Sequence, residues 1–589
     1  MRRVTSLLIP IIAFIFILAL YGALPFVSLT TLGQAIWLIG FSQSFANQGL
    51  FSLHATNFGY PEPAAISFGL AAAYPASMLI RLGLHPADAY SLMHAFWLLV
   101  SFLGAWKIAK SHFRLSSTNS TITSVLWLSL PAVWIHTGYS ALGIAIGLIP
   151  FYFWTALELF GNNVNAKKGI KFYRLPGKFV LYMLATVISV FMDGYSFVMF
   201  AIASTFLGIY QFFQVPKDRK ALITIRFIIH CICFGLAYIL YAIYIGKPQY
   251  EPATLDFFRG WGMDLSFVVL PTRGIHWLWD TLGLSVTRIS SEQFGDSSIW
   301  RSTYSAPFII FGLVAWWQTR RTSKFANLFL IIAIFGFYMA LGPSLKVNSM
   351  RPADFESQLM PAEYAVLPTG NGWLSANVPG FKSMRAAYRW IALANLGLWL
   401  LVISLMAHHK NKLIKRLISF LCVLLIASNV PNLHQTLALK YKLRQRFLDI
   451  ESSLIQDFKK DLKQDEIVAF LPFGNDFFVN YIASRVNIIS YNIGGDKNLA
   501  EARKHWPSTM SGFEFRAIDK DFTERIIALL REGEADVVVL PYLDLLWAPH
   551  NWPTESEFND ELKTVINSLI ATGTVNVDET TYYSTVRLK

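Results

Sequence analysis

The sequence predicts an α-helical polytopic membrane protein with about 11 transmembrane helices, followed by a C-terminal soluble α/β domain. Hydrophobic types make up 54% of the 589 residues and charged types only 15%, whereas soluble globular proteins carry about 25% charged residues. Of the 37 acidic residues, 14 lie in residues 1–430 and 23 in 431–589. The net charge of +13 therefore belongs to the membrane part, and no nucleic-acid partner is predicted.

The first apolar segment covers about residues 5–28, within a stretch from 4 to 61 that has no Asp, Glu, Lys or Arg. It is long enough to cross a bilayer, which takes about 20 apolar residues. A cleaved signal peptide has a shorter apolar core, so we expect an uncleaved first span. Ten further spans are predicted at 89–109, 121–138, 141–160, 179–192, 195–213, 222–245, 304–319, 325–342, 386–407 and 413–429.

The loops between these spans alternate in charge. Lys and Arg cluster in every second loop, whereas the short turns at 139–140 and 193–194 carry neither. Positively charged loops stay in the cytoplasm, which predicts a cytoplasmic N-terminus and an extracytoplasmic C-terminus. Three long loops, 29–88, 246–303 and 343–385, are then on the outer face.

Residues 63–80 are also uncharged and compete as a further span. They contain two prolines and runs of small residues, and a span here would move the basic loop around Lys107 to the outside. An interfacial or re-entrant helix is therefore the preferred interpretation.

The tail from 431 to 589 is predicted to form an extracytoplasmic α/β domain. Short apolar runs indicate strands at 466–471, 487–491, 536–541 and 582–588. Helical patterns occupy about 440–463, 498–505, 520–532 and 556–570. The length is sufficient for one small domain with its own core.

Acidic residues of the outer face are the candidate catalytic groups. Glu62, in Tyr60-Pro61-Glu62-Pro63, is the first acid of the chain and is interpreted either as a general base or as a solvated loop residue. Asp193 is a second candidate, although Asp-Gly also suits a tight turn. Asp88 is a third, although its position before an apolar helix also suits an N-cap.

A basic segment before the span at 386–407 is the candidate phosphate site. Arg385 and Arg389 are four residues apart, which places them on one face of a helix. Arginine binds phosphate bidentately, and Lys382 adds a third cation. The alternative is anchoring to the outer leaflet, but outer arginines run against the positive-inside bias.

The layout resembles the GT-C superfamily of polytopic membrane glycosyltransferases. The similarity covers most of residues 1–430, and its local motifs are Phe45-Ala46-Asn47-Gln48-Gly49-Leu50, the Tyr60-Pro61-Glu62 loop, and Gly380-Phe381 followed by Arg385 and Arg389. The resemblance implies transfer of a hexose or pentose from a polyprenyl-phosphate donor to an envelope glycan or lipid-linked acceptor, outside a bacterial inner membrane. It implies Glu62 as the base, the arginines at the lipid phosphate, and neither a cofactor nor a metal.

Two other classes of function stay open from the sequence. A transporter or flippase of lipid-linked intermediates would be expected to carry charges at mid-membrane and two repeated halves, and no repeat is found. A non-catalytic envelope assembly protein would use the outer tail for binding.

Overall fold

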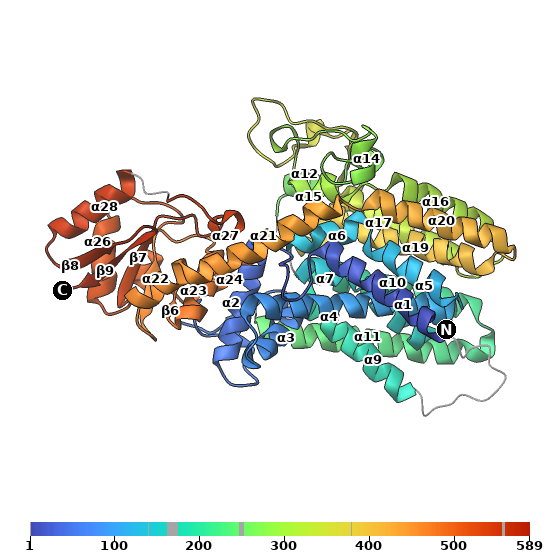
Figure 1. The fold of residues 1–589 in the computed structure, drawn as a ribbon, viewed down its shortest axis with the longest axis horizontal. Coiled ribbons are helices and arrows are strands. Elements are labelled where there is room, and N and C mark those ends of the chain that lie inside the picture. Colours follow the sequence, from blue (N-terminus) through green and yellow to red (C-terminus); the bar gives the residue numbers. More distant parts are fainter. Residues whose placement is uncertain (1, 140, 162–174, 247–252, 379, 557–559) are drawn as a thin grey trace. The chain divides into compact units, whose positions relative to one another are not determined.

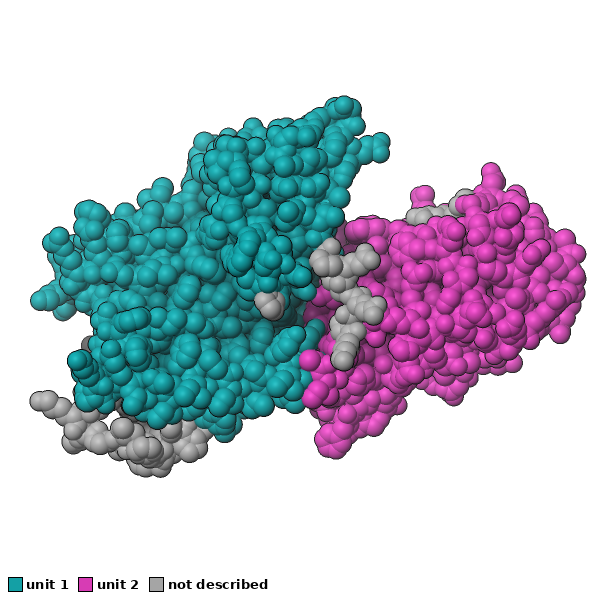
Figure 2. Space-filling view, turned by 180° about the vertical axis from the view of Figure 1, so that it is seen from behind, with its two compact units in different colours: residues 1–22, 95–241, 251–437 teal, residues 23–94, 242–250, 438–589 magenta. Residues whose placement is uncertain are grey.

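The computed structural model describes residues 2–139, 141–161, 175–246, 253–378, 380–556 and 560–589, and divides the chain into two compact units. Unit 1 comprises residues 1–22, 95–241 and 251–437, and unit 2 comprises 23–94, 242–250 and 438–589. Figure 1 shows the elements along the chain, and Figure 2 colours the two units. Residues 29–88, which the sequence assigns to the first outer loop, thus belong to the same unit as the tail.

Unit 1 is built almost entirely of helices. Its longer helices are α1 (Arg2–Tyr21), α5 (Ser117–Leu128), α8 (Ile149–Phe160), α9 (Leu175–Met192), α10 (Gly194–Gln214), α16 (Ala306–Thr319), α17 (Ala326–Leu341), α19 (Ile391–His408) and α20 (Lys412–Asn429). Its shorter elements are η1 (Ile108–His112), α6 (Pro131–Trp134), η2 (Ile135–Tyr139), α7 (Ala141–Gly147), η4 (Lys217–Arg219), α12 (Leu255–Gly260), α13 (Leu265–Val269), α14 (Trp277–Thr281), η5 (Ser290–Glu292), α15 (Ser297–Ser302), β3 (Ser344–Leu345), η6 (Ala362–Tyr364), β4 (Leu367–Pro368), α18 (Asn371–Asn377), η7 (Phe381–Ser383) and η8 (Ala387–Trp390). Along the chain, α4 (Pro86–Lys107), α11 (Lys220–Ile245) and α21 (Leu433–Ser452) begin in one unit and end in the other.

Helix α19 forms the core of unit 1, with all of its residues from Ile391 to Met406 buried. Glycines bring it close to α17. A β-carbon at Gly336 would lie 2.3 Å from the Ala394 nitrogen, and one at Gly397 would lie 2.4 Å from the Phe329 carbonyl oxygen. Small residues permit such close approach between apolar helices.

In the part of the chain that the structure describes, four helices are long and apolar enough to cross a bilayer, namely Pro86–His112, Gly194–Gln214, Lys217–Ile245 and Ala387–His408. Two bent helix pairs, Ala141–Gly147 with Ile149–Phe160 and Lys412–Asn429 with Leu433–Asp461, bring the number to at most six within the described residues. The predicted number of 11 is therefore not confirmed. Several expected spans are shorter helices, and that at 121–138 is interrupted where α6 begins at Pro131.

Unit 2 contains a five-stranded sheet with the strand order β6-β5-β7-β9-β8. Its strands are β5 (Ile467–Phe470), β6 (Ile489–Ser490), β7 (Val537–Pro541), β8 (Val575–Glu579) and β9 (Tyr583–Leu588), and the first three are parallel. Its other elements are α2 (Gly33–Asn47), β1 (His54–Ala55), β2 (Ala64–Ala65), α3 (Leu70–Arg81), α22 (Leu454–Asp461), α23 (Phe477–Val486), α24 (Asp496–Ala502), η9 (Arg503–His505), α25 (Ser508–Ser511), α26 (Phe522–Arg531), α27 (Ala548–Asn551) and α28 (Asp560–Ala571). The four predicted strands are confirmed, and β8 was missed because it is an edge strand with polar residues.

Residues 23–94 pack on the tail through several long-range contacts. The Trp37 indole donates to the Gly494 carbonyl over 2.7 Å, and Phe58 forms a parallel bridge with Ser490 beside β6. Only the later part of the segment at 63–80 is helical: it forms α3, which has 12 residues and is too short to cross a bilayer by itself.

Candidate functional site

The predicted arginine pair lies before α19: Arg385 lies between the short turns η7 and η8, and Arg389 lies within η8. The spacing predicted that the two residues share one face of a helix. They do not, because the backbone is not helical at Ala386 (φ −90°, ψ 77°). The Ala386 N–H donates to the Tyr195 hydroxyl over 2.7 Å, and the Tyr388 N–H donates to the Trp261 carbonyl over 3.0 Å. These long-range bonds replace the local helical ladder.

The Arg389 guanidinium is surrounded by three tyrosine rings. Its central carbon lies 5.2 Å from the ring centre of Tyr139, 5.1 Å from that of Tyr195 and 5.7 Å from that of Tyr388. All three distances are in the range of a cation–π interaction. The Nε atom of Arg389 is buried and has no hydrogen-bond partner among the described residues, so the side chain retains donor capacity.

The second arginine, Arg385, lies against an aromatic pair. Its guanidinium carbon is 5.1 Å from the ring centre of Phe257, and Phe257 stacks on Trp261 with 4.0 Å between ring centres. The third predicted cation, Lys382, is exposed in η7. The segment therefore combines two half-buried cations, Arg385 and Arg389, with one exposed cation, Lys382.

A buried lysine holds the loop that carries Trp261. The Lys346 ammonium donates to the carbonyl oxygens of Arg259, Gly260 and Gly262 over 2.7, 3.3 and 2.5 Å. Burial lowers the pKa of Lys346 to about 8. These three bonds fix the backbone on both sides of Trp261.

Asp296 is a carboxylate of this region that the sequence analysis did not single out. It accepts a 2.7 Å hydrogen bond from the Trp261 indole and caps α15 by accepting from the Ser298 N–H over 2.8 Å. Burial and the charge of Asp296 raise the pKa of Tyr139, whereas Arg389 lowers it. Asp296 and Arg389 thus both act on one tyrosine, although they are 93 positions apart in the sequence. The only local signal is the Gly-Asp-Ser pattern of an N-cap.

Asp193 occupies the turn between α9 and α10. It caps α10 by accepting from the N–H groups of Tyr195 and Ser196 over 2.7 and 3.4 Å. The conformational interpretation of this Asp-Gly turn is therefore confirmed. The cap also sets the position of Tyr195, which contacts Arg389 and holds Ala386.

Glu62 and Asp88, both in unit 2, differ in their surroundings. Glu62 is exposed in the loop between β1 and β2, and no hydrogen bond or ion pair is recorded for its carboxylate within the described chain. Asp88 lies in the first turn of α4, which begins at Pro86, so the expected N-cap role is wrong. Both of its oxygens instead accept from Arg444 over 3.0 Å.

A separate hollow of about 250 Å³ opens beside β5 and β7 in unit 2. It contains Asp476, which is buried and accepts from the Gly474 N–H and the Asn492 amide over 3.0 and 2.7 Å. Burial raises the pKa of Asp476 to about 6. In the described ranges, no group of three or more His, Cys, Asp or Glu residues is arranged to hold a metal ion.

No protein-family model matches the chain, and no curated protein matches its sequence. Solved structures do match. The arabinofuranosyltransferase AftD from Mycobacteria is 11% identical with a TM-score of 0.53, and the match covers 100% of this chain. This chain spans 40% of the length of AftD.

Two further solved structures match over most of the chain. ArnT from Cupriavidus metallidurans bound to undecaprenyl phosphate is 10% identical with a TM-score of 0.47, covering 99% of this chain and 97% of ArnT. The Archaeoglobus fulgidus oligosaccharyltransferase with a tethered acceptor peptide is 11% identical with a TM-score of 0.49. This match covers 91% of this chain and 69% of the oligosaccharyltransferase. The likeness to AftD carries the assignment of the fold: the chain has the fold of the GT-C glycosyltransferases, as its sequence predicts.

Proposed function

We propose that the protein is a membrane glycosyltransferase that takes a sugar from a polyprenyl-phosphate-linked donor and transfers it to an envelope glycan or lipid-linked acceptor. The observation that carries this proposal is the environment of Arg389. Its guanidinium lies among three tyrosine rings at the start of an apolar helix, and no ion pair is recorded for it among the described residues.

A lipid phosphate fits this environment for two reasons. The rings attract the cation through their faces and leave its N–H groups to be used by an anion in the plane of the guanidinium. Charge develops on the phosphate as it leaves the sugar, and a fixed cation in a site of low dielectric constant stabilises that charge. Arg385 and Lys382 are proposed to contact the same phosphate.

The proposed step is a single displacement. An acceptor hydroxyl attacks the anomeric carbon, the bond from that carbon to the phosphate oxygen breaks, and the polyprenyl phosphate leaves with the electron pair. A carboxylate accepts the hydroxyl proton. Glu62 is the proposed base because it is exposed and has no recorded partner, and Asp193 and Asp88 are the alternatives, although each already has hydrogen-bonded partners.

The proposed location is a bacterial inner membrane, with the N-terminus in the cytoplasm and the tail outside. Reporter fusions after residues 115 and 411 should report the cytoplasm, and a fusion after 435 should report the outside. A cytoplasmic tail would contradict the scheme, because the candidate groups would then be on the wrong face.

The phosphate site is tested by binding of undecaprenyl phosphate to the purified full-length protein. Arg389→Ala should weaken binding about tenfold or more, since a hydrogen bond to a charged group contributes roughly 1.5–3 kcal/mol. Arg389→Lys should restore it only in part, because an ammonium makes no bidentate contact.

Arg320→Ala is the matched control for this experiment. The Arg320 guanidinium also lies over an aromatic ring, 3.7 Å from the ring centre of Trp317, but at the far end of α16 in a loop predicted to be cytoplasmic. Binding should be unchanged. Equal binding by the wild type and Arg389→Ala would refute the phosphate site and leave the pair as an interfacial anchor.

A further inference from the structure

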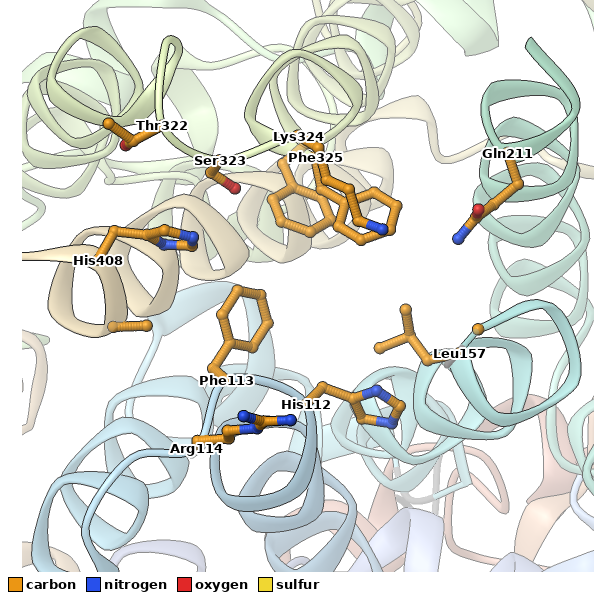
Figure 3. Close-up of a pocket in the computed structure, with 13 residues that line it drawn as sticks. His112, Phe113, Arg114, Leu157, Gln211, Thr322, Ser323, Lys324, Phe325 and His408 are labelled. Carbon is orange, nitrogen blue, oxygen red and sulfur yellow. The ribbon is translucent and has the colours of Figure 1, made fainter. Parts of the chain in front are cut away.

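A second basic site lies at the other end of the helices that border Arg389. A cavity of about 560 Å³ is lined by residues from η1, α8, α10, α19 and the loop between α16 and α17 (Figure 3). Its volume lies in the range of small-molecule sites, roughly 300–1,000 Å³. All of these residues belong to unit 1.

The position of the cavity relative to Arg389 follows from α10 and α19. Tyr195 and Arg389 lie at the beginnings of these helices, whereas Gln211 and His408, which line the cavity, lie near their ends. The helices have 21 and 18 residues, which correspond to about 32 and 27 Å at 1.5 Å per residue. The two sites are thus about one hydrocarbon thickness apart. The loops at the cavity are those that the charge pattern assigns to the cytoplasm.

The cavity is lined by cations and by no carboxylate. Arg114, Lys324, His112 and His408 are among its 13 lining residues, which include no Asp or Glu. Glu158 directly follows the lining residue Leu157 in the sequence, and its carboxylate contacts His112 at 3.2 Å and Lys178 at 2.8 Å. Among the described residues, no ion pair is recorded for Arg114 or Lys324.

Polar and aromatic side chains complete the wall. Gln211 and Lys324 point toward each other across the cavity, and His408 points into it (Figure 3). Phe113, Phe325 and Phe329 form a connected apolar wall, with 6.2 Å between the ring centres of Phe113 and Phe329 and 6.0 Å between those of Phe325 and Phe329. The cavity therefore offers both cationic donors and an apolar surface.

We propose that this cavity binds an organic phosphate, with Arg114 and Lys324 contacting the phosphate and the phenylalanine wall contacting the apolar part of the ligand. Two cations without an acidic counterpart favour a phosphomonoester or diphosphate over a neutral ligand. Basic hollows between transmembrane helices on the cytoplasmic side recognise anionic head groups. The same chemistry also suits a soluble phosphate compound. The site differs from that at Arg389 in residues and in membrane face, and does not depend on the proposed glycosyltransferase activity.

The test uses the full-length protein with two probes, phosphatidic acid and inorganic pyrophosphate. Both are measured in the Arg389→Ala background, so that a phosphate bound at the other end of the helices does not contribute. Adding Arg114→Gly and Lys324→Ala should weaken binding of at least one probe tenfold or more. Loss of phosphatidic acid alone assigns a lipid head group, whereas loss of pyrophosphate, alone or with the lipid, assigns a soluble phosphate.

The choice of glycine at position 114 and one control variant keep the test informative. Arg114 has a φ of +56°, a conformation that glycine adopts without strain, so Arg114→Gly removes the charge without disturbing the backbone. Arg321→Ala removes a neighbouring cation that does not line the cavity, and should change neither affinity. If neither probe binds, or if both bind the cavity variant as they bind its parent, the proposal is overturned.

Discussion

The two compact units surround several of their half-buried arginines differently. In unit 2, three carboxylates each accept hydrogen bonds from two nitrogen atoms of one arginine, in the pairs Asp88–Arg444, Glu451–Arg485 and Glu466–Arg587. In unit 1, Arg389 lies among three tyrosine rings, with no ion pair recorded within the described residues. A forked pair neutralises the charge of both partners and occupies part of the arginine's hydrogen-bonding capacity, two of its five N–H donors. A ring face attracts the cation and leaves that capacity for a ligand.

Glu62 provides the test with the largest expected effect, because it is a carboxylate of unit 2 that has no arginine. Glu62→Gln should slow sugar transfer by about 10² to 10⁴, as expected for loss of a general base, while donor binding and stability remain unchanged. The measurement is the transfer rate from a labelled polyprenyl-phosphate sugar in proteoliposomes. Glu514→Gln, at an exposed acid of the tail, should retain the wild-type rate.

A wild-type rate for Glu62→Gln combined with a slow Asp193→Asn would move the base to unit 1. Loss of donor binding in Glu62→Gln would instead indicate a binding role. Either result would mean that Glu62 is not the catalytic base, so that it would no longer differ in role from the carboxylates of the forked pairs.

The forked pairs should matter for stability instead. The side chains of Asp88 and Arg444 are 8% and 16% exposed, and removing one partner of a buried pair costs about 3–5 kcal/mol. Asp88→Asn should therefore destabilise unit 2 by about 3 kcal/mol, measured by hydrogen exchange at the start of α4 and in α21.

The exposed pair Lys504–Glu501 serves as the control, with side chains that are 31% and 38% exposed. Glu501→Gln should cost less than about 1 kcal/mol, the usual contribution of a surface pair. Equal losses in the two variants would mean that burial does not distinguish the forked pairs.

The sequence predicted elements where a local pattern is strong. The apolar runs behind α10, α11 and α19 and those behind β5 and β7 all form the expected elements. In these segments, the length and composition of the apolar run distinguish a long helix from a short buried strand.

Long-range contacts account for what the sequence did not predict. The helix expected at Arg385 and Arg389 is absent because Ala386 and Tyr388 donate to Tyr195 and Trp261. Asp296 carries no local mark beyond an N-cap. The packing of residues 23–94 on the tail depends on pairs such as Trp37 and Gly494, which are 457 positions apart. No local spacing encodes partners of this kind.

Asp476 sharpens the comparison because it is a buried acid of unit 2 without a forked arginine pair. Its pKa is raised from 3.8 to about 6, so between these values the folded state binds more protons than the unfolded state. Stability should therefore fall as the pH rises from about 4 to 6. Asp476→Asn should gain up to about 3 kcal/mol at pH 7.5 and little at pH 4, measured by hydrogen exchange of β5 and β7. A loss of stability at pH 7.5 would show that the charged form is the one that the Gly474 and Asn492 donors favour.

The smallest expected effect concerns Arg114, a cation of unit 1 for which no pairing is recorded in the described ranges. Its φ of +56° costs a residue with a β-carbon roughly 1–2 kcal/mol. Replacement by glycine relieves this strain, but the greater freedom of glycine in the unfolded chain offsets part of the gain. Arg114→Gly should therefore stabilise the ligand-free protein by up to about 1 kcal/mol, measured as a rise in the thermal unfolding midpoint. Arg114→Ala keeps the strain and should bring no such gain, so the difference between the two variants isolates the backbone term. Arg444→Ala, which removes the arginine of a forked pair, should instead lower the thermal unfolding midpoint. If Arg114→Gly destabilises the ligand-free protein as Arg444→Ala is expected to, then Arg114 stabilises the fold, and the contrast between cations kept for ligands and cations kept for pairing fails at this position.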